Sequence, residues 1–392
     1  MITNGFTYIA FLIFLAGIFL FLEKKTKAKI FNVVPPLVWI YVLNMIFCTL
    51  GLYKSEACEA TYSALKNNIL YAMIFVMLLR CDFRKLSKLG GRMVAIFLGC
   101  SVTLAIGFLL GYPIFKGMLG SNTWGAVAAL YASWVGGSAN MAAMQAALPV
   151  DAGAYSCALA LDTVCYSVWI ALLLLAVKYA GRWNSAVKAD TSKLQAIAES
   201  ANAEVSKGKK NATSADWIFL IGLSLMVSAL SQMVGKSCNA ALTAAGLGMF
   251  DKGTLTTVFV SILGLICAGT SLGKLPAVEE LSNVYLYTVV SLLASTASVS
   301  DLLSAPMWVV YGLFILTIHV VLMYLLSKAF HWDLCMVSTA SLANIGGSAS
   351  APIVASAYDP SYAGIGVLMG VLGAAIGNFM GLGMGALLRL FL

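Results

Sequence analysis

Charged residues are scarce in this sequence. Asp, Glu, Lys and Arg make up 10% of the 392 residues, whereas hydrophobic residues make up 61% and the mean hydropathy is +0.92. A soluble globular domain is charged at about a quarter of its positions. The apolar residues gather in stretches of about 20 residues, which is the length that crosses a hydrocarbon core as a helix. The composition therefore excludes an ordinary soluble protein and predicts an all-α membrane protein.

Catalytic and metal-binding motifs are also missing. The sequence has two His and nine Cys, and no two Cys form a C-x-x-C pair. It contains no phosphate-binding loop of the G-x-x-x-x-G-K type, no H-E-x-x-H and no G-x-S-x-G. We therefore expect no enzymatic activity, no cofactor and no ATP-driven transport by this chain alone.

The net charge of +8 does not indicate a nucleic acid partner. The basic residues lie in short loops beside apolar stretches, where they set the membrane topology. The first apolar stretch lacks the basic segment and the cleavage site of a signal peptide, so we expect it to remain as a span.

The apolar stretches divide the chain into two halves around a polar linker. We expect a first half over residues 1–180, a linker over 181–214 with a helix around Thr191–Ala203, and a second half over 215–392. The expected spans are 6–22, 34–53, 65–80, 92–113, 123–148, 152–180, 215–235, 254–271, 279–299, 306–328, 334–356 and 361–391.

Residues 237–250 decide the number of spans. They are apolar but short, and counting them raises the total from 12 to about 13. With 13 spans the second half is inverted, and the positive-inside rule favours that arrangement. It places the N-terminus outside, the basic loop from Arg80 to Arg92 inside and the linker outside.

One short segment occurs twice. Gly136-Gly137-Ser138-Ala139 in the first half is repeated as Gly346-Gly347-Ser348-Ala349 in the second, 210 residues later and again midway along an apolar span. Paired glycines are unfavourable inside a helix. They can serve close helix packing, but matched pairs at matched positions favour a discontinuous helix whose unwound backbone lines a binding site. The sequence thus predicts two inverted repeats, each with one broken helix.

Few polar residues within the spans could take part in transport. Asp162 is an acidic residue about ten residues into its span. Ionisable groups within a membrane are energetically costly and rare, so such a residue is a functional candidate. His319 could relay protons or pair with Asp162, although a lone His is often a satisfied core residue, and Asn378 roughly parallels Asp162 in the second half. Neutral oxygens near the glycine pairs suit sodium or a polar solute, with Asp162, Asn140 and Asn344 as the candidate sodium ligands. The other candidates are Ser138, Gln145, Ser348 and Ser350.

The segments Trp134-Val-Gly-Gly-Ser-Ala-Asn and Asn344-Ile-Gly-Gly-Ser-Ala-Ser-Ala-Pro resemble those of the YjcL-like family of membrane proteins of unknown function. The resemblance covers nearly the whole chain. That family is similar to a larger group of sodium/proton antiporters, bile-acid/sodium symporters and glutamate/sodium symporters. The resemblance implies a core domain with two broken helices, a scaffold or dimerisation domain, a homodimer and elevator-like alternating access. Asp162 stands where the antiporters carry a carboxylate, but Leu161 replaces the adjacent polar partner.

Three functions remain open at this point. The favoured one is sodium- or proton-coupled uptake of a small, anionic organic solute across the bacterial inner membrane. A monovalent cation/proton antiporter that uses Asp162 is the alternative, and a channel or sensor is the third.

Overall fold

The computed structural model describes residues 1–26, 30–33, 36–81, 86, 89–191, 194–205, 211–244, 252–299 and 305–391, which are mainly helical and contain no strand. Seven of the described helices are long and apolar enough to cross a membrane, so the chain is an integral membrane protein. The helices are α1 (Gly5–Thr26), α2 (Ile30–Val33), α3 (Pro36–Thr49), α4 (Glu56–Leu79), α6 (Gly90–Leu119), α7 (Trp124–Gly136), α8 (Ser138–Ala147), α9 (Ala152–Ala176), α10 (Ala180–Val187), α11 (Leu194–Val205), α12 (Ser214–Ala244), α13 (Lys252–Ala268), α14 (Val278–Ala294), α15 (Ala305–Phe330), α16 (Leu334–Ile345), α17 (Gly347–Tyr358) and α18 (Ala363–Leu388).

Most expected spans coincide with one helix each, and α11 confirms the helix expected in the linker. The segment 237–250 differs from the expectation. Its first part continues α12 without a break to Ala244, and the rest lies outside the described residues. The described part therefore adds no separate span.

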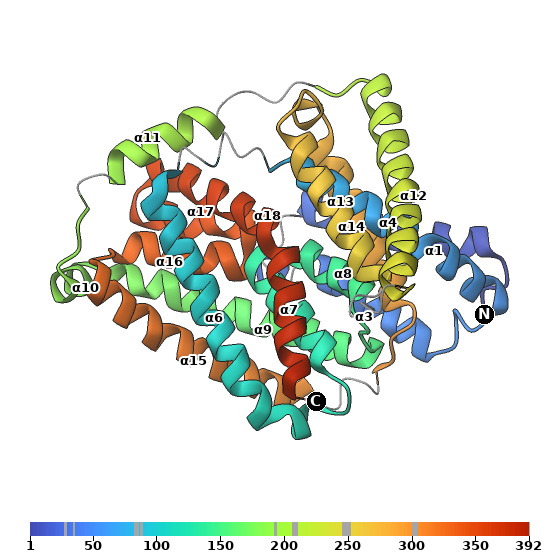
Figure 1. The fold of residues 1–392 in the computed structure, drawn as a ribbon, viewed down its shortest axis with the longest axis horizontal. Coiled ribbons are helices and arrows are strands. Elements are labelled where there is room, and N and C mark those ends of the chain that lie inside the picture. The colour runs from blue at the N-terminus through green and yellow to red at the C-terminus, as the bar shows by residue number, and fades with distance from the viewer. Residues whose placement is uncertain are drawn as a thin grey trace.

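The helices pack in two groups, each of which takes helices from both sides of the linker. The first group, at the right of Figure 1, contains α1, α3, α4, α12, α13 and α14. The second group, at the left and centre, contains α6 to α9 and α15 to α18. Contacts between the groups run mainly through α8, which packs on α4 and α13. The largest of the three buried apolar clusters among the described residues contains residues of both groups.

Both glycine pairs break a helix, as the sequence predicts. α7 ends at Gly136 and α8 begins at Ser138, with Gly137 between them at a φ of +94°. α16 ends at Ile345 and α17 begins at Gly347, which has a φ of +70°. Positive φ is the conformation that glycine adopts without the penalty of a Cβ atom. The backbone can therefore change direction at these two points.

The two arms at each break fold back on each other and do not continue in line. Gly125, near the start of α7, lies against the carbonyl of Pro149, just beyond the end of α8. At the second break the Ser338 hydroxyl, in the second turn of α16, lies 3.1 Å from the hydroxyl of Tyr358, the last residue of α17. We call α7–α8 the first hairpin and α16–α17 the second hairpin. Neither 123–148 nor 334–356 is a single continuous span, so the count of about 13 spans is not supported.

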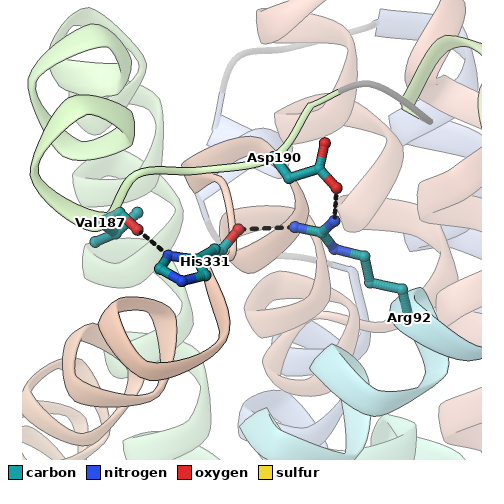
Figure 2. Close-up of polar contacts among 4 residues, drawn as sticks. All are labelled: Arg92, Val187, Asp190 and His331. Carbon is teal, nitrogen blue, oxygen red and sulfur yellow. Dashed lines mark hydrogen bonds and ion pairs between the residues drawn. The ribbon is translucent and has the colours of Figure 1, made fainter.

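One end of the molecule gathers the linker and three other segments, and we call it the linker end. Arg92, in the first turn of α6, lies 2.8 Å from the carboxylate of Asp190 in the linker and donates a hydrogen bond of 2.7 Å to the carbonyl of His331 (Figure 2). The His331 ring in turn lies 2.8 Å from the carbonyl of Val187. Arg80 pairs with Glu279 at 3.1 Å. The start of α6, the linker and the base of the second hairpin therefore lie together. The start of α14 belongs to the same end, because it contacts Arg80 at the end of α4, and only the short segment 80–89 separates α4 from α6 in the chain.

The chain termini mark the opposite end, which we call the terminal end. The Ile2 amide bonds to the carbonyl of Leu52, and Lys116 at the end of α6 bonds to the carbonyl of Phe391 at 2.6 Å. The base of the first hairpin also lies here, because Arg389 stacks over the ring of Trp124. The two hairpins therefore enter the molecule from opposite ends.

This arrangement corrects the expected position of the linker. We expected the Arg80–Arg92 loop and the linker on opposite sides of the membrane, but the contact between Arg92 and Asp190 places them on the same side. The physical reason is the first hairpin. Because α7–α8 enters and leaves at the terminal end, the chain makes one crossing fewer between Arg92 and the linker.

The pair of Arg92 and Asp190 gives a test of this placement. Arg92→Glu should lower the stability by about 1 kcal/mol or less, because the side chains are 25% and 50% exposed and such pairs are weak. Adding Asp190→Arg should restore part of the loss, since it reverses the pair and leaves the two residues opposite in charge. Thermal unfolding in detergent measures both variants. A double variant no more stable than Arg92→Glu would contradict the contact.

Candidate functional site

Each hairpin tip combines the end of one helix with the start of another. The Gly137 amide donates to the Ser133 carbonyl at 2.7 Å and closes α7, and the Gly346 amide donates to the Leu342 carbonyl at 2.7 Å and closes α16. New helices then begin at the same points. Each tip therefore presents backbone carbonyls from a helix C-terminus and amides from a helix N-terminus, which favour cations and anions respectively.

Both tips rest on the middle of α18. The backbone and side chain of Ser348 at the second tip pack directly against Gly370. One turn further along α18, Gly373 packs against the carbonyl of Val135 at the first tip, and a Cβ atom placed on Gly136 would lie 2.6 Å from the Gly373 carbonyl oxygen. The absence of a side chain at Gly370 and at Gly373 is what lets the two tips approach the same stretch of α18.

The glycine face of α18 continues along the first hairpin. Gly377 faces Asn140 and the Cα atom of Gly136, and Gly381 faces Ala132 and Met144 of the two arms. Gly377, Gly381 and Gly385 therefore allow close packing, whereas Gly383 is exposed and faces open space.

Asn140 and Asn378 connect the first tip to the other helix group. The Asn140 side-chain amide donates a hydrogen bond of 2.9 Å to the Asn378 side-chain oxygen, and the Asn378 amide donates one of 3.0 Å to the Ser261 hydroxyl on α13. All these side chains are buried. The Asn140 oxygen has no hydrogen-bond partner among the described residues, although it lies against the backbone of Gly136. A buried oxygen without a donor is costly, so this atom is available to a donor or a cation.

Asp162 lies at the first tip, on α9. Its carboxylate accepts one hydrogen bond from the Ser133 hydroxyl at 3.0 Å and one from the Trp134 indole at 2.8 Å, both in the last turn of α7. The Asp162 side chain is only partly buried. The structure thus places Asp162 and Asn378 against the same hairpin, Asp162 from α9 and Asn378 from α18.

Tyr166 links α9 to the second tip. Its hydroxyl lies 2.9 Å from the Ser350 hydroxyl, its ring packs on Gly346, and Ser350 also donates to the Gly346 carbonyl at 3.1 Å. The sequence interpretation missed Tyr166. It follows Asp162 by four residues, and residues at that spacing share one face of a helix. That spacing could have identified it, so α9 contacts the first tip through Asp162 and the second through Tyr166.

Among the described residues, the side chains of Asn344 and Gln145 form no hydrogen bond to this cluster. The Asn344 oxygen accepts from Ser101 at 2.7 Å, and its amide donates to Ala340 at 2.9 Å, so the side chain is committed to α6 and to its own helix. Gln145 is buried two turns beyond the first tip, with its oxygen unpaired among the described residues. The proposed sodium ligands Asp162, Asn140 and Asn344 each bond to a different neighbouring helix, namely α7, α18 and α6.

His319 belongs to a separate buried network. Its ring nitrogens lie 2.7 Å from the Thr103 hydroxyl and 2.8 Å from the Ser341 hydroxyl, and the Trp169 indole donates to Ser341 at 3.0 Å. Because Thr103 donates to the Cys100 carbonyl at 2.9 Å, one ring nitrogen donates to Thr103 and the other accepts from Ser341. A neutral imidazole satisfies all these bonds. The partners of the His319 ring are therefore Thr103 and Ser341, and not Asp162, which the sequence analysis allowed as a partner.

Comparison with known proteins gives one match. A family model described as "Protein of unknown function (DUF819)" matches residues 10–391, which is nearly the whole chain. No curated protein and no solved structure matches.

Proposed function

Because the chain belongs to the family of proteins of unknown function DUF819, we propose its function from its geometry: it is a secondary active transporter whose site lies between the two hairpin tips. The observation that carries the proposal is the convergence of both tips on the middle of α18, with α9 contacting each of them. Two broken segments that meet midway between opposite ends are typical of carriers with alternating access.

The same geometry supports an inverted repeat with ten crossing helices and two re-entrant hairpins. α1, α3, α4, α6 and α9 precede the linker, and α12, α13, α14, α15 and α18 follow it. An odd number of crossings in the first half gives the second half the opposite orientation. The hairpins, one in each half, then enter from opposite faces.

The positive-inside rule then places the linker end in the cytoplasm and both termini outside. The terminal end, counted together with the half of each helix nearest to it, carries six of the 24 Lys and Arg, namely Lys54, Lys66, Lys116, Lys236, Lys252 and Arg389. The other 18 lie in segments whose neighbouring described residues are at the linker end. The basic linker, which conflicted with the rule in the 13-span arrangement, now agrees with it.

The transported solute is small and anionic, and its movement is coupled to sodium or protons. The N-termini of α8 and α17 both begin at the tips, and helix N-termini favour carboxylate and phosphate groups. The Asp162 carboxylate, the Asn140 oxygen and the carbonyls at the ends of α7 and α16 offer oxygen ligands to a cation. The second helix group moves against the first, which serves as the scaffold and the dimer contact.

A cation/proton antiporter remains the second candidate, because Asp162 lies in the interior of an apolar helix and could exchange a proton for a cation. Flux measurements in proteoliposomes distinguish the solute transporter from the antiporter. A sodium or proton gradient should drive accumulation of a member of a panel of labelled mono-, di- and tricarboxylates. Sodium-dependent proton movement without any solute would favour the antiporter instead. If neither gradient moved a solute or a cation, the transporter proposal would be wrong.

A further inference from the structure

A groove of about 270 Å³ opens on the side of the second helix group, away from the hairpin tips. Its walls are α9, α15 and α16, and α10 closes it at the linker end through Trp183. Leu172 on α9 and Val320 on α15 line it and are 50% and 44% exposed, so the groove opens on the surface that faces lipid. A solute site reached from water would have its opening at one end of the molecule instead.

The polar atoms that line the groove are already in use. The ring nitrogens of His319 and the Ser341 hydroxyl form the buried network described above, and the Ser338 hydroxyl bonds to Tyr358. The Trp169 indole is also committed to Ser341. The groove therefore offers an apolar surface and no free polar group, which suits a hydrocarbon chain.

Basic and aromatic side chains surround the groove at the linker end. Lys178, Arg182 and Lys328 are exposed there, on the turn after α9, on α10 and on α15. Arg182 lies over the ring of Tyr179, and the rings of Trp183 and Tyr324 meet edge to face with centroids 5.2 Å apart. Tyr and Trp of this kind mark the level of lipid headgroups, where Lys and Arg attract anionic ones.

The nearby acids do not cancel this charge. Asp190 is paired with Arg92, and Asp333 accepts from the Met336 amide at 3.0 Å as the cap of α16. We propose that the groove binds one acyl chain of an anionic phospholipid, with the headgroup held by Lys178, Arg182 and Lys328. The site is independent of the transport proposal. Because α16 belongs to the second hairpin and α9 contacts both tips, a bound lipid would contact the helices that shape the central site.

The test uses the purified full-length protein and two lipids with the same acyl chains, phosphatidylglycerol and phosphatidylcholine. Native mass spectrometry measures how much of each lipid the protein retains. Wild type should retain phosphatidylglycerol at least about tenfold better than phosphatidylcholine, because each nearby Lys or Arg changes anionic lipid binding by about fivefold and three are present. Replacing Lys178, Arg182 and Lys328 with Gln should remove that preference.

Ala176→Phe places a ring in the groove and should weaken retention about tenfold, because it displaces at least two methylene groups of the chain. Ala171→Phe is the matched control, since Ala171 is an exposed residue of α9 outside the groove. If Ala176→Phe does not fold, Val320→Trp fills the groove from α15, where the side chain is already exposed. Wild-type retention in a folded groove variant, or equal retention of the two lipids by wild type, would overturn the proposal.

Discussion

Asp162→Asn should reduce gradient-driven transport at least about 100-fold while leaving the protein folded. The carboxylate is the one acidic group in the interior of the described membrane helices, because the other acids there lie at helix ends or in the linker helix α11. Asn can still accept a hydrogen bond from Trp134 or Ser133, so the α7–α9 contact persists. It cannot supply the negative charge that attracts a cation in a medium of low dielectric constant.

The measurement is the initial rate of ion-driven flux into proteoliposomes, with thermal unfolding of the same preparation as the check on folding. Asp151→Asn is the matched control on the same helix. Asp151 is the exposed N-cap of α9 and accepts from the Ala154 amide at 3.0 Å, and Asn caps a helix as well as Asp does. It should transport at the wild-type rate. A folded Asp162→Asn protein with a rate within twofold of wild type would remove the carboxylate from the mechanism.

Gly370→Val should destabilise the protein by about 3 kcal/mol. Any Cβ atom on Gly370 would overlap the backbone of Ser348 at the second tip, and overpacking of this kind typically costs about 1–3 kcal/mol. The upper end of this range applies because the Cβ atom would meet the backbone of Ser348, which cannot rotate away as a side chain can. The hairpin tip would have to move from α18, so transport should also fall.

Gly383→Val is the control for that variant, because Gly383 lies on the same helix with nothing near the position of its Cβ atom. Valine forms helix somewhat better than glycine, so Gly383→Val should leave the stability unchanged or slightly raised. Thermal unfolding in detergent compares the two variants directly. Equal unfolding temperatures would show that the α18 glycine face does not hold the second hairpin.

The sequence was sufficient to predict the helix breaks but not their consequence. A pair of glycines midway along an apolar segment, found twice with an offset of 210 residues, indicated a discontinuity at each site. Hydropathy could not tell whether the arms continue in line or fold back, because 123–148 is long enough for either. The structure decides between the two, because the contact of Gly125 with the Pro149 carbonyl brings the outer ends of α7 and α8 together.

The error in topology came from that ambiguity and not from the charge rule. Counting both glycine segments as crossings required a thirteenth span to satisfy the charges of the second half. With a hairpin at each site, the proposed inverted arrangement no longer needs 237–250 as a span, and Arg92 and Asp190 lie on the same side. The contacts of Asn140 with Asn378 and of Tyr166 with Ser350 join residues 238 and 184 positions apart, and no local pattern in the sequence predicts such pairings.

The central claim is that the two hairpins enter the membrane from opposite faces. Labelling of single cysteines with an impermeant maleimide on intact and permeabilised cells tests it most directly. Ser121→Cys and Pro149→Cys flank the first hairpin, and Ala329→Cys and Pro360→Cys flank the second; all four positions are exposed. The background replaces Cys48, Cys238 and Cys267, because the other cysteines are buried.

We expect both cysteines of the first pair to react in intact cells and both of the second pair to react only after permeabilisation. The two members of a pair must behave alike, because each hairpin returns to the face from which it enters. If the members of either pair reacted from opposite faces, that segment would cross the membrane and the account of the site would be wrong. If all four reacted from one face, the hairpins would not oppose each other.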